Sequence, residues 1–122
     1  MRKNKRKSLV NYESERRRFV ARFEKYGRRP PIPHEPDASL VTLLFSQVRD
    51  KETNGFVSQH IWLVEDENLK AVYPLNPGDQ VEFEALVRRY RKGYWGEKSY
   101  IFGRPPDYDY GLAHPTDITV RR

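Results

Sequence analysis

The chain has no cysteine and only one methionine among its 122 residues. Without cysteine it has no disulfide bond, no thiolate nucleophile and no cysteine-bound zinc. No apolar run approaches the roughly 20 residues that a membrane-spanning helix needs, so we expect no membrane partner. The basic first residues are not followed by the apolar segment of a signal peptide, which favours a cytoplasmic protein.

The sequence also lacks the motifs of catalysis and cofactor binding. His34, His60 and His114 lie far apart, and none has a second ligand at metal-binding spacing. No serine nucleophile motif and no glycine-rich phosphate loop is present. The adjacent acids at residues 65–67 point apart and do not predict a metal site. We therefore expect no enzymatic activity, no catalytic residues, no metal and no cofactor.

Charge is abundant, and it is unevenly distributed. The net charge is +6, from 23 Lys and Arg against 17 Asp and Glu. Residues 1–29 carry 12 basic and 3 acidic side chains, residues 30–87 carry 3 and 10, and residues 88–122 carry 8 and 4. Two basic regions around an acidic one favour a polyanionic partner that is held at defined places. The alternative is that the charges only keep the surface solvated.

Apolar residues near the N-terminus recur at three- and four-residue spacing, which predicts an amphipathic α-helix over residues 11–26. These apolar positions are Tyr12, Phe19, Val20, Phe23 and Tyr26. With the basic arm before it, the helix forms a predicted N-terminal unit, residues 1–27. Its other face carries Arg17, Arg18 and Arg22, which either contact nucleic acid or stay solvated.

Residues 28–37 contain four prolines in ten positions. Neither a helix nor an inner strand tolerates that density, because proline has no N–H to donate. Residues 28–39 are therefore predicted to form a semi-rigid linker between the N-terminal unit and a main domain, residues 40–122.

The main domain begins with a pattern typical of a β-hairpin. Residues 40–48 and 56–64 predict two strands, and the Asn54-Gly55 pair between them is a strong turn signal. Residues 68–73 fit either a short helix or a third strand. A polar linking segment of this length suits a small β domain with short connections.

A third clear strand follows the turn at residues 76–79. Its inner positions alternate strictly, as half-buried strands do, and they are Val81, Phe83, Ala85 and Val87. Further strands are predicted at residues 100–102 and 116–121, the last with Ile118 and Val120 facing inward. Between the third strand and residue 100, cationic and aromatic residues alternate in a predicted hairpin.

These elements together resemble an OB fold, the oligonucleotide/oligosaccharide-binding domain. The likeness extends over residues 40–120 and includes the strand ending Ile61-Trp62-Leu63-Val64, the strand opening Pro77-Gly78-Asp79-Gln80-Val81, and the long hairpin after it. The resemblance implies a mainly β fold, a small five-stranded Greek-key barrel, to which the periodicity adds an N-terminal α-helix. The pattern is also similar to small prokaryotic and phage proteins of unassigned function.

The resemblance also implies where a ligand would bind. OB domains commonly hold single strands between the first hairpin loop and the loop joining the fourth and fifth strands. In this chain the two loops map to residues 49–55, which are charge-balanced, and residues 88–98, which are basic and aromatic. The expected nucleic-acid-binding residues are Arg88, Arg89, Tyr90, Arg91, Lys92, Tyr94, Trp95, Lys98 and Tyr100. Additional candidate contacts are Arg17, Arg18, Arg22, Arg49 and Trp62.

The expected function is thus a non-catalytic module that binds single-stranded DNA or RNA through the basic, aromatic hairpin. The alternative is a protein-interaction OB adaptor, a subunit of a replication, repair or defence complex. In that case the predicted N-terminal helix would dock on a partner protein or form a homodimer.

Overall fold

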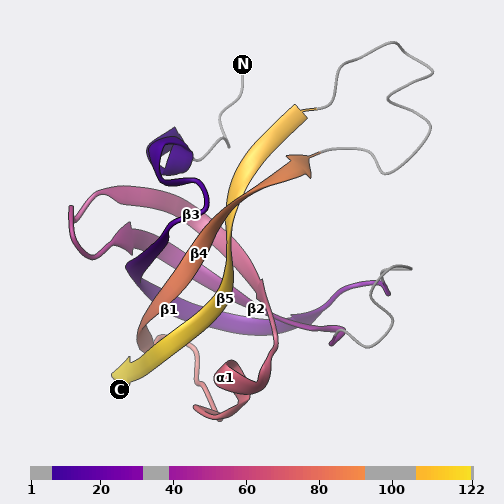
Figure 1. Ribbon diagram of the computed structural model, residues 1–122. Coiled ribbons are helices and arrows are strands. Elements are labelled where there is room, and N and C mark those ends of the chain that lie inside the picture. The colour runs from indigo at the N-terminus through magenta and orange to yellow at the C-terminus, as the bar shows by residue number, and fades with distance from the viewer. Residues whose placement is uncertain (1–6, 32–38, 93–106, 122) are drawn as a thin grey trace.

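A computed structural model describes residues 7–31, 39–92 and 107–121, and these form a mainly β protein. A single antiparallel sheet has the strand order β3-β2-β1-β4-β5 (Figure 1). The strands are β1 (Arg16–Arg28), β2 (Val41–Asp50), β3 (Phe56–Val64), β4 (Gln80–Lys92) and β5 (Asp107–Arg121). Two short helical segments accompany them, the 3-10 helix η1 (Lys7–Tyr12) and the α-helix α1 (Glu67–Lys70).

The predicted α-helix over residues 11–26 is wrong. Among the described residues at this end of the chain only η1 is helical, and β1 is the central strand of the sheet, paired with β2 on one side and β4 on the other. The proline-rich segment therefore connects two neighbouring strands of one sheet. Residues 16–28 belong to the same sheet as the rest of the described chain.

An irregularity in β1 explains why its sequence imitates a helix. Phe19, Ala21 and Phe23 are buried at every second position, as in any strand with one face inward. A register shift between Phe23 and Lys25 then adds one residue and places Tyr26 against Phe23, with the ring centroids 4.8 Å apart. The large apolar residues therefore follow a spacing of four and three, which is also the spacing of a helix face.

The predictions for the following hairpin are confirmed. Strands β2 and β3 pair in antiparallel fashion around a turn in which Asn54 has φ 60°. Of the two alternatives for residues 68–73, the short helix is the one present, as α1. Its N-terminus is capped by Asp66, whose side chain accepts a hydrogen bond of 2.9 Å from the Leu69 N–H.

The last two strands also follow the predicted alternation. Val81, Phe83, Ala85 and Val87 of β4 are buried. Strand β5 begins before the predicted residues 116–121, and Ile118 and Val120 pack against the core as expected. The predicted strand at residues 100–102 lies outside the described residues.

The sheet curls around its own core (Figure 1). Strands β4 and β5 cross in front of the other three, and η1 and α1 lie at opposite ends of the curl. The interior holds a cluster of rings, with Phe45 lying 5.7 Å from Phe23 and 5.9 Å from Phe83 between centroids. Leu9 of η1 and Leu69 of α1 are buried in the same cluster. Burial of such rings is the main source of stability in a sheet this small.

The predicted five-stranded Greek-key barrel is present only as a five-stranded antiparallel sheet, and no closed barrel is found among the described residues. Strands β3 and β5 are the two edges of the sheet, and they contact one another. Within the described residues no ladder of hydrogen bonds joins these two edges. The curl therefore leaves a seam between β3 and β5, and this seam contains the candidate site.

Candidate nucleic-acid interface

A cleft of about 290 Å³ lies along the seam between the two edge strands. One wall is the end of β3 and the residues after it, 62–66, and the other wall is residues 112–115 of β5. Arg29 and Arg88 complete the lining. The cleft thus joins an aromatic ring, two guanidinium groups and two carboxylates that are far apart in the sequence.

Trp62 is the exposed aromatic group of this cleft. Its side chain stands on the outer face of β3, in register with Leu44 of β2, and 48% of its surface is exposed. The indole lies directly over Gly27 of β1, because a Cβ atom built on Gly27 would stand 2.8 Å from the ring carbon Cζ3. A flat ring held at the surface by its neighbours is suited to stack on a base.

Two arginines supply the positive charge of the cleft. Arg88 is exposed on β4, and its guanidinium forms no hydrogen bond or ion pair anywhere in the described part of the chain. Arg29, directly after β1, donates from Nε to the Ser39 carbonyl at 3.1 Å. Its Nη1 is buried and has no partner among the described residues.

The β3 wall is fixed by the Glu65 carboxylate. Ser39 Oγ donates to Glu65 Oε1 at 2.8 Å, and the Tyr73 hydroxyl donates to Oε2 at 2.8 Å. Burial opposes ionisation of Glu65, but these two hydrogen bonds outweigh it and hold its pKa below the usual value. Burial and the neighbouring Glu65 raise the pKa of Tyr73. At neutral pH the ionised Glu65 carboxylate therefore holds Ser39, at the end of the β1–β2 connection, beside the cleft.

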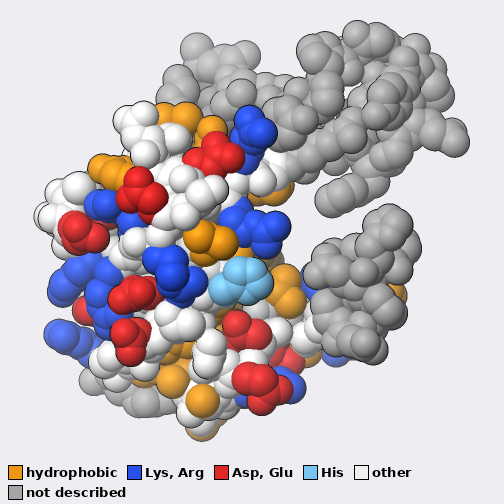
Figure 2. All heavy atoms as spheres, viewed as in Figure 1, with side chains coloured by type: hydrophobic (Ala, Val, Ile, Leu, Met, Phe, Trp, Pro, Cys, Tyr) orange, Lys and Arg blue, Asp and Glu red, His pale blue; other side chains and the backbone are white. Residues whose placement is uncertain are grey.

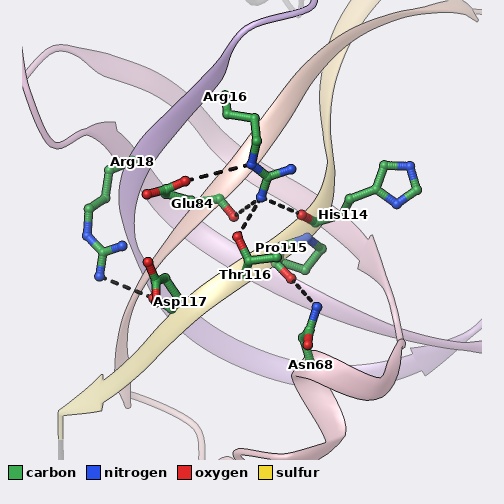
Figure 3. Close-up of polar contacts among 8 residues, drawn as sticks. All are labelled: Arg16, Arg18, Asn68, Glu84, His114, Pro115, Thr116 and Asp117. Carbon is green, nitrogen blue, oxygen red and sulfur yellow. Dashed lines mark hydrogen bonds and ion pairs between the residues drawn. The ribbon is translucent and has the colours of Figure 1, made fainter.

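The β5 wall bulges at residues 114 and 117, and polar contacts hold the bulges from two sides (Figure 3). Arg16 of β1 reaches past β4 and donates from Nη2 to the His114 carbonyl at 2.8 Å. Asn68 of α1 donates from Nδ2 to the Pro115 carbonyl at 3.0 Å from the opposite side. The imidazole of His114 points away from these contacts. The wall is therefore held in place through its backbone.

The residues predicted to bind nucleic acid on β4 are only partly described. Arg88, Arg89 and Tyr90 are exposed, and Arg89 Nε lies 3.9 Å from the Glu13 carboxylate. Arg91 and Lys92 belong to the end of β4. The predicted contacts Tyr94, Trp95, Lys98 and Tyr100 lie outside the described residues. Of the described residues in the predicted set, Arg88 lines the cleft.

Two of the additional candidates have structural partners. Arg17 Nε donates to Asp50 Oδ2 at 2.7 Å, and the Arg17 guanidinium lies 3.8 Å from the centre of the Tyr12 ring. Arg18 Nε donates to Glu82 Oε2 at 2.5 Å. The hydrogen bond that Arg17 donates to Asp50 raises the pKa of Arg17, as expected for a charge that is stabilised by its partner. These arginines brace the sheet and do not line the cleft.

The other additional candidates are at the surface, and only one of them reaches the cleft. Arg22 lies 3.7 Å from the Glu24 carboxylate, and Arg49 makes a 3.5 Å contact with the Asn54 carbonyl. Trp62 alone of the five lines the cleft. Figure 2 shows Lys and Arg side chains interleaved with Asp and Glu over the face of β1, β4 and β5, with no continuous basic patch there.

Sequence reasoning missed Gly27, Arg29 and Glu65 as parts of this site. No local pattern marks Gly27 or Glu65, because their importance depends on Trp62 and Ser39, which are distant in the chain. Arg29 had a signal, since it stands at the start of the proline-rich segment. Arg29 could be assigned to the site from the sequence only if residues 16–28 were recognised as a strand.

The geometry defines a class of protein, a curled five-stranded antiparallel sheet with a cleft at its seam. Comparison with protein-family models, with curated proteins and with solved structures finds no match for this chain. Within the described residues, no helix is long and apolar enough to cross a membrane. The same residues contain no group of three or more acidic or histidine side chains placed to hold a metal ion.

Proposed function

We propose that this protein is a non-catalytic, single-stranded nucleic-acid-binding module with an OB-like fold. The observation that carries the proposal is the exposed Trp62 ring in one cleft with Arg29 and Arg88. An aromatic platform beside guanidinium groups is an arrangement that binds single strands, because rings stack on bases and an exposed guanidinium such as that of Arg88 holds a phosphate. A nucleic-acid single strand supplies both bases and phosphates at regular intervals.

Strand order supports the OB-like part of the proposal. The first strand is central, a short helix stands between β3 and β4, and the two edge strands approach one another. These features suit a five-stranded, partly open Greek-key barrel. With β1 as the first strand, the binding loops become the connections over residues 29–40 and 93–106. The second contains four of the nine binding residues expected from the sequence, Tyr94, Trp95, Lys98 and Tyr100.

Base stacking and phosphate contacts make separate contributions to affinity, and salt affects them differently. Each base stacked on an aromatic ring contributes about 1–3 kcal/mol. Each phosphate neutralised on a single strand adds about 0.7 to the slope of log affinity against log salt. Binding should therefore weaken as salt rises, and a component due to Trp62 should persist at high salt.

The test is fluorescence anisotropy with a labelled 12-mer of single-stranded DNA, the same sequence in RNA, and the DNA duplex. Trp62→Ala and Arg88→Ala are each expected to weaken single-strand binding about fivefold or more, with a smaller salt slope for Arg88→Ala. Matched controls are Phe56→Ala, an exposed aromatic residue at the other end of β3, and Arg121→Ala at the end of β5. Unchanged affinity in both cleft variants, or equal loss in the controls, would remove this cleft from the function.

The protein-adaptor alternative relied on an N-terminal amphipathic helix. That segment is instead the central strand β1, and its side chains Phe19, Ala21 and Phe23 are in the core. A buried strand has no free apolar face to offer a partner, so no observation favours this second function.

A further inference from the structure

Building on the proposed function, we propose that the seam cleft receives one unstacked nucleobase and that the phosphates stay outside it. A nucleic-acid strand could bind at the protein surface without any base entering the cleft between residues 62–66 and 112–115.

The side chains that line the cleft carry almost no net charge. The two guanidinium groups of Arg29 and Arg88 are balanced in number by the two carboxylates of Glu65 and Asp66. Glu65 is held ionised by its two hydrogen bonds, and a phosphate beside it would meet like charge. A neutral heterocycle meets no such repulsion.

The shape of the cleft is the second argument. Its walls are joined at one end by the hydrogen bond from Asn68 to the Pro115 carbonyl, 3.0 Å long (Figure 3). The opposite ends of the walls are Trp62 and Leu112, and Arg88 stands beside Leu112 because it pairs with Gly111. The cleft is therefore closed near α1 and open at Trp62 and Arg88. A chain of nucleotides cannot run through it, whereas a single base can enter from the mouth.

Size and chemistry agree with one base. The volume of about 290 Å³ is at the lower limit for ligand pockets, which leaves room for a single ring system. Every base has a face for the Trp62 indole and an edge that carries both donors and acceptors. The Arg29 guanidinium carries donors, and the Glu65 and Asp66 carboxylates are acceptors. Arg88 at the mouth is then placed for the adjoining phosphate.

This arrangement gives a physical reason for single-strand selectivity. A base in a duplex has its pairing edge occupied and its faces stacked, and its extraction costs a few kcal/mol. A base in a single strand is free to enter. The same reasoning predicts that a polyanion without bases gains nothing from the cleft.

The experiment compares a dT 12-mer with a 12-mer of the same backbone in which every residue is abasic. Both are titrated into the full-length protein at high salt, and both into Trp62→Ala. We expect the wild-type protein to bind the dT strand about 5- to 150-fold more tightly than the abasic strand, which is the range of one stacked base. Trp62→Ala should abolish most of this difference and leave the abasic affinity unchanged.

A second measurement does not depend on a cleft variant folding well. The chain has two tryptophans, Trp62 and Trp95, so Trp95→Phe leaves Trp62 as the single indole reporter. The dT strand should quench Trp62 fluorescence, while the abasic strand and inorganic phosphate should not.

The outcomes separate the two proposals. If the abasic strand binds as tightly as dT and quenches Trp62 equally, base insertion is wrong, and salt-dependent single-strand binding still stands. If neither strand binds the wild-type protein even at low salt, the proposed function fails and the inference fails with it. If dT binds more tightly but Trp62→Ala keeps the difference, bases are read somewhere other than this cleft.

Discussion

Trp62 and Gly27 form the contact on which the candidate site depends. They lie on strands β3 and β1, separated by β2, and the indole covers the glycine so closely that a Cβ atom there would stand 2.8 Å from the ring. The same Cβ would lie 3.1 Å from Thr42 Oγ1. The backbone of β1 at Gly27 thus supports the indole ring of Trp62.

Gly27→Ala should therefore displace the indole. A contact below 3.0 Å cannot be absorbed without movement, and the exposed end of the Trp62 side chain is the part that moves. We expect weaker single-strand binding and a change in the near-ultraviolet circular dichroism of tryptophan. Gly55→Ala is the control, because its Cβ would meet only Thr53 Oγ1 at 3.1 Å on an exposed turn. Binding by Gly27→Ala at the wild-type level would show that the ring position is not important.

The ion pair of Arg17 and Asp50 should be a large source of stability. Their side chains are only 11% and 6% exposed, and the Nε–Oδ2 distance is 2.7 Å. Removal of one partner leaves a buried charge unpaired, at a cost of about 3–5 kcal/mol. Arg17→Ala is expected to lower the free energy of unfolding in urea by about that amount.

The matched control is Arg22→Ala, whose side chain is 54% exposed and 3.7 Å from Glu24. Surface pairs of this kind contribute about 0–1 kcal/mol. A similar loss in both variants would contradict the assignment of Arg17 as a buried structural residue.

Stability should fall in acid for an identifiable reason. The Arg18 hydrogen bond lowers the pKa of Glu82, and hydrogen bonds from Arg17 and the turn backbone lower that of Asp50 against its burial. The pKa of Glu65 is lowered as well. A carboxyl with a depressed folded-state pKa stabilises the fold above its unfolded value, about 4, and loses that contribution as pH falls through the lower folded value.

The free energy of unfolding should therefore be nearly constant from pH 7 to about pH 5 and should decrease below about pH 4. Glu65→Gln keeps the shape and the hydrogen-bond acceptor but cannot titrate, so its acid-dependent loss should be smaller. An acid limb identical to that of the wild-type protein would exclude Glu65 as a contributor.

Phe19→Ala tests whether β1 is a core strand. Phe19 is fully buried, and its ring centroid lies 6.1 Å from that of Phe83. Deletion of a buried aromatic ring costs about 3–5 kcal/mol, so the variant should be strongly destabilised in urea. Val10→Ala in η1 is the control, because Val10 is exposed, and it should change stability by less than about 0.5 kcal/mol. Near-wild-type stability of Phe19→Ala would mean that residues 16–28 are not in the core.

Strands with regular alternation and a local turn could be predicted from the sequence. Strand β4 was recognisable because Val81, Phe83 and Ala85 alternate without interruption after a turn. The β2–β3 hairpin was recognisable from Asn54-Gly55, since a tight turn sets the register of its two strands. These signals act over a few residues and need no knowledge of the rest of the fold.

The position of β1 could not be predicted in the same way. Its register shift between Phe23 and Lys25 produces helical spacing in a strand, and only pairing with β2 and β4 on both sides makes the strand the stable form. Because of that one error, the strands at residues 41–50 and 56–64 were predicted as first and second, whereas they are second and third in the structure.

The sequence by itself determined the mainly β character, the absence of cysteine chemistry, and the alternation that buries one face of β4. Only the tertiary structure decided which side chains meet at the seam. Trp62 rests on Gly27, and Glu65 holds Ser39, across strands whose approach depends on how far the sheet curls. Sheet curl is set by twist, bulges and core packing summed over the whole chain, so no local stretch of sequence specifies it.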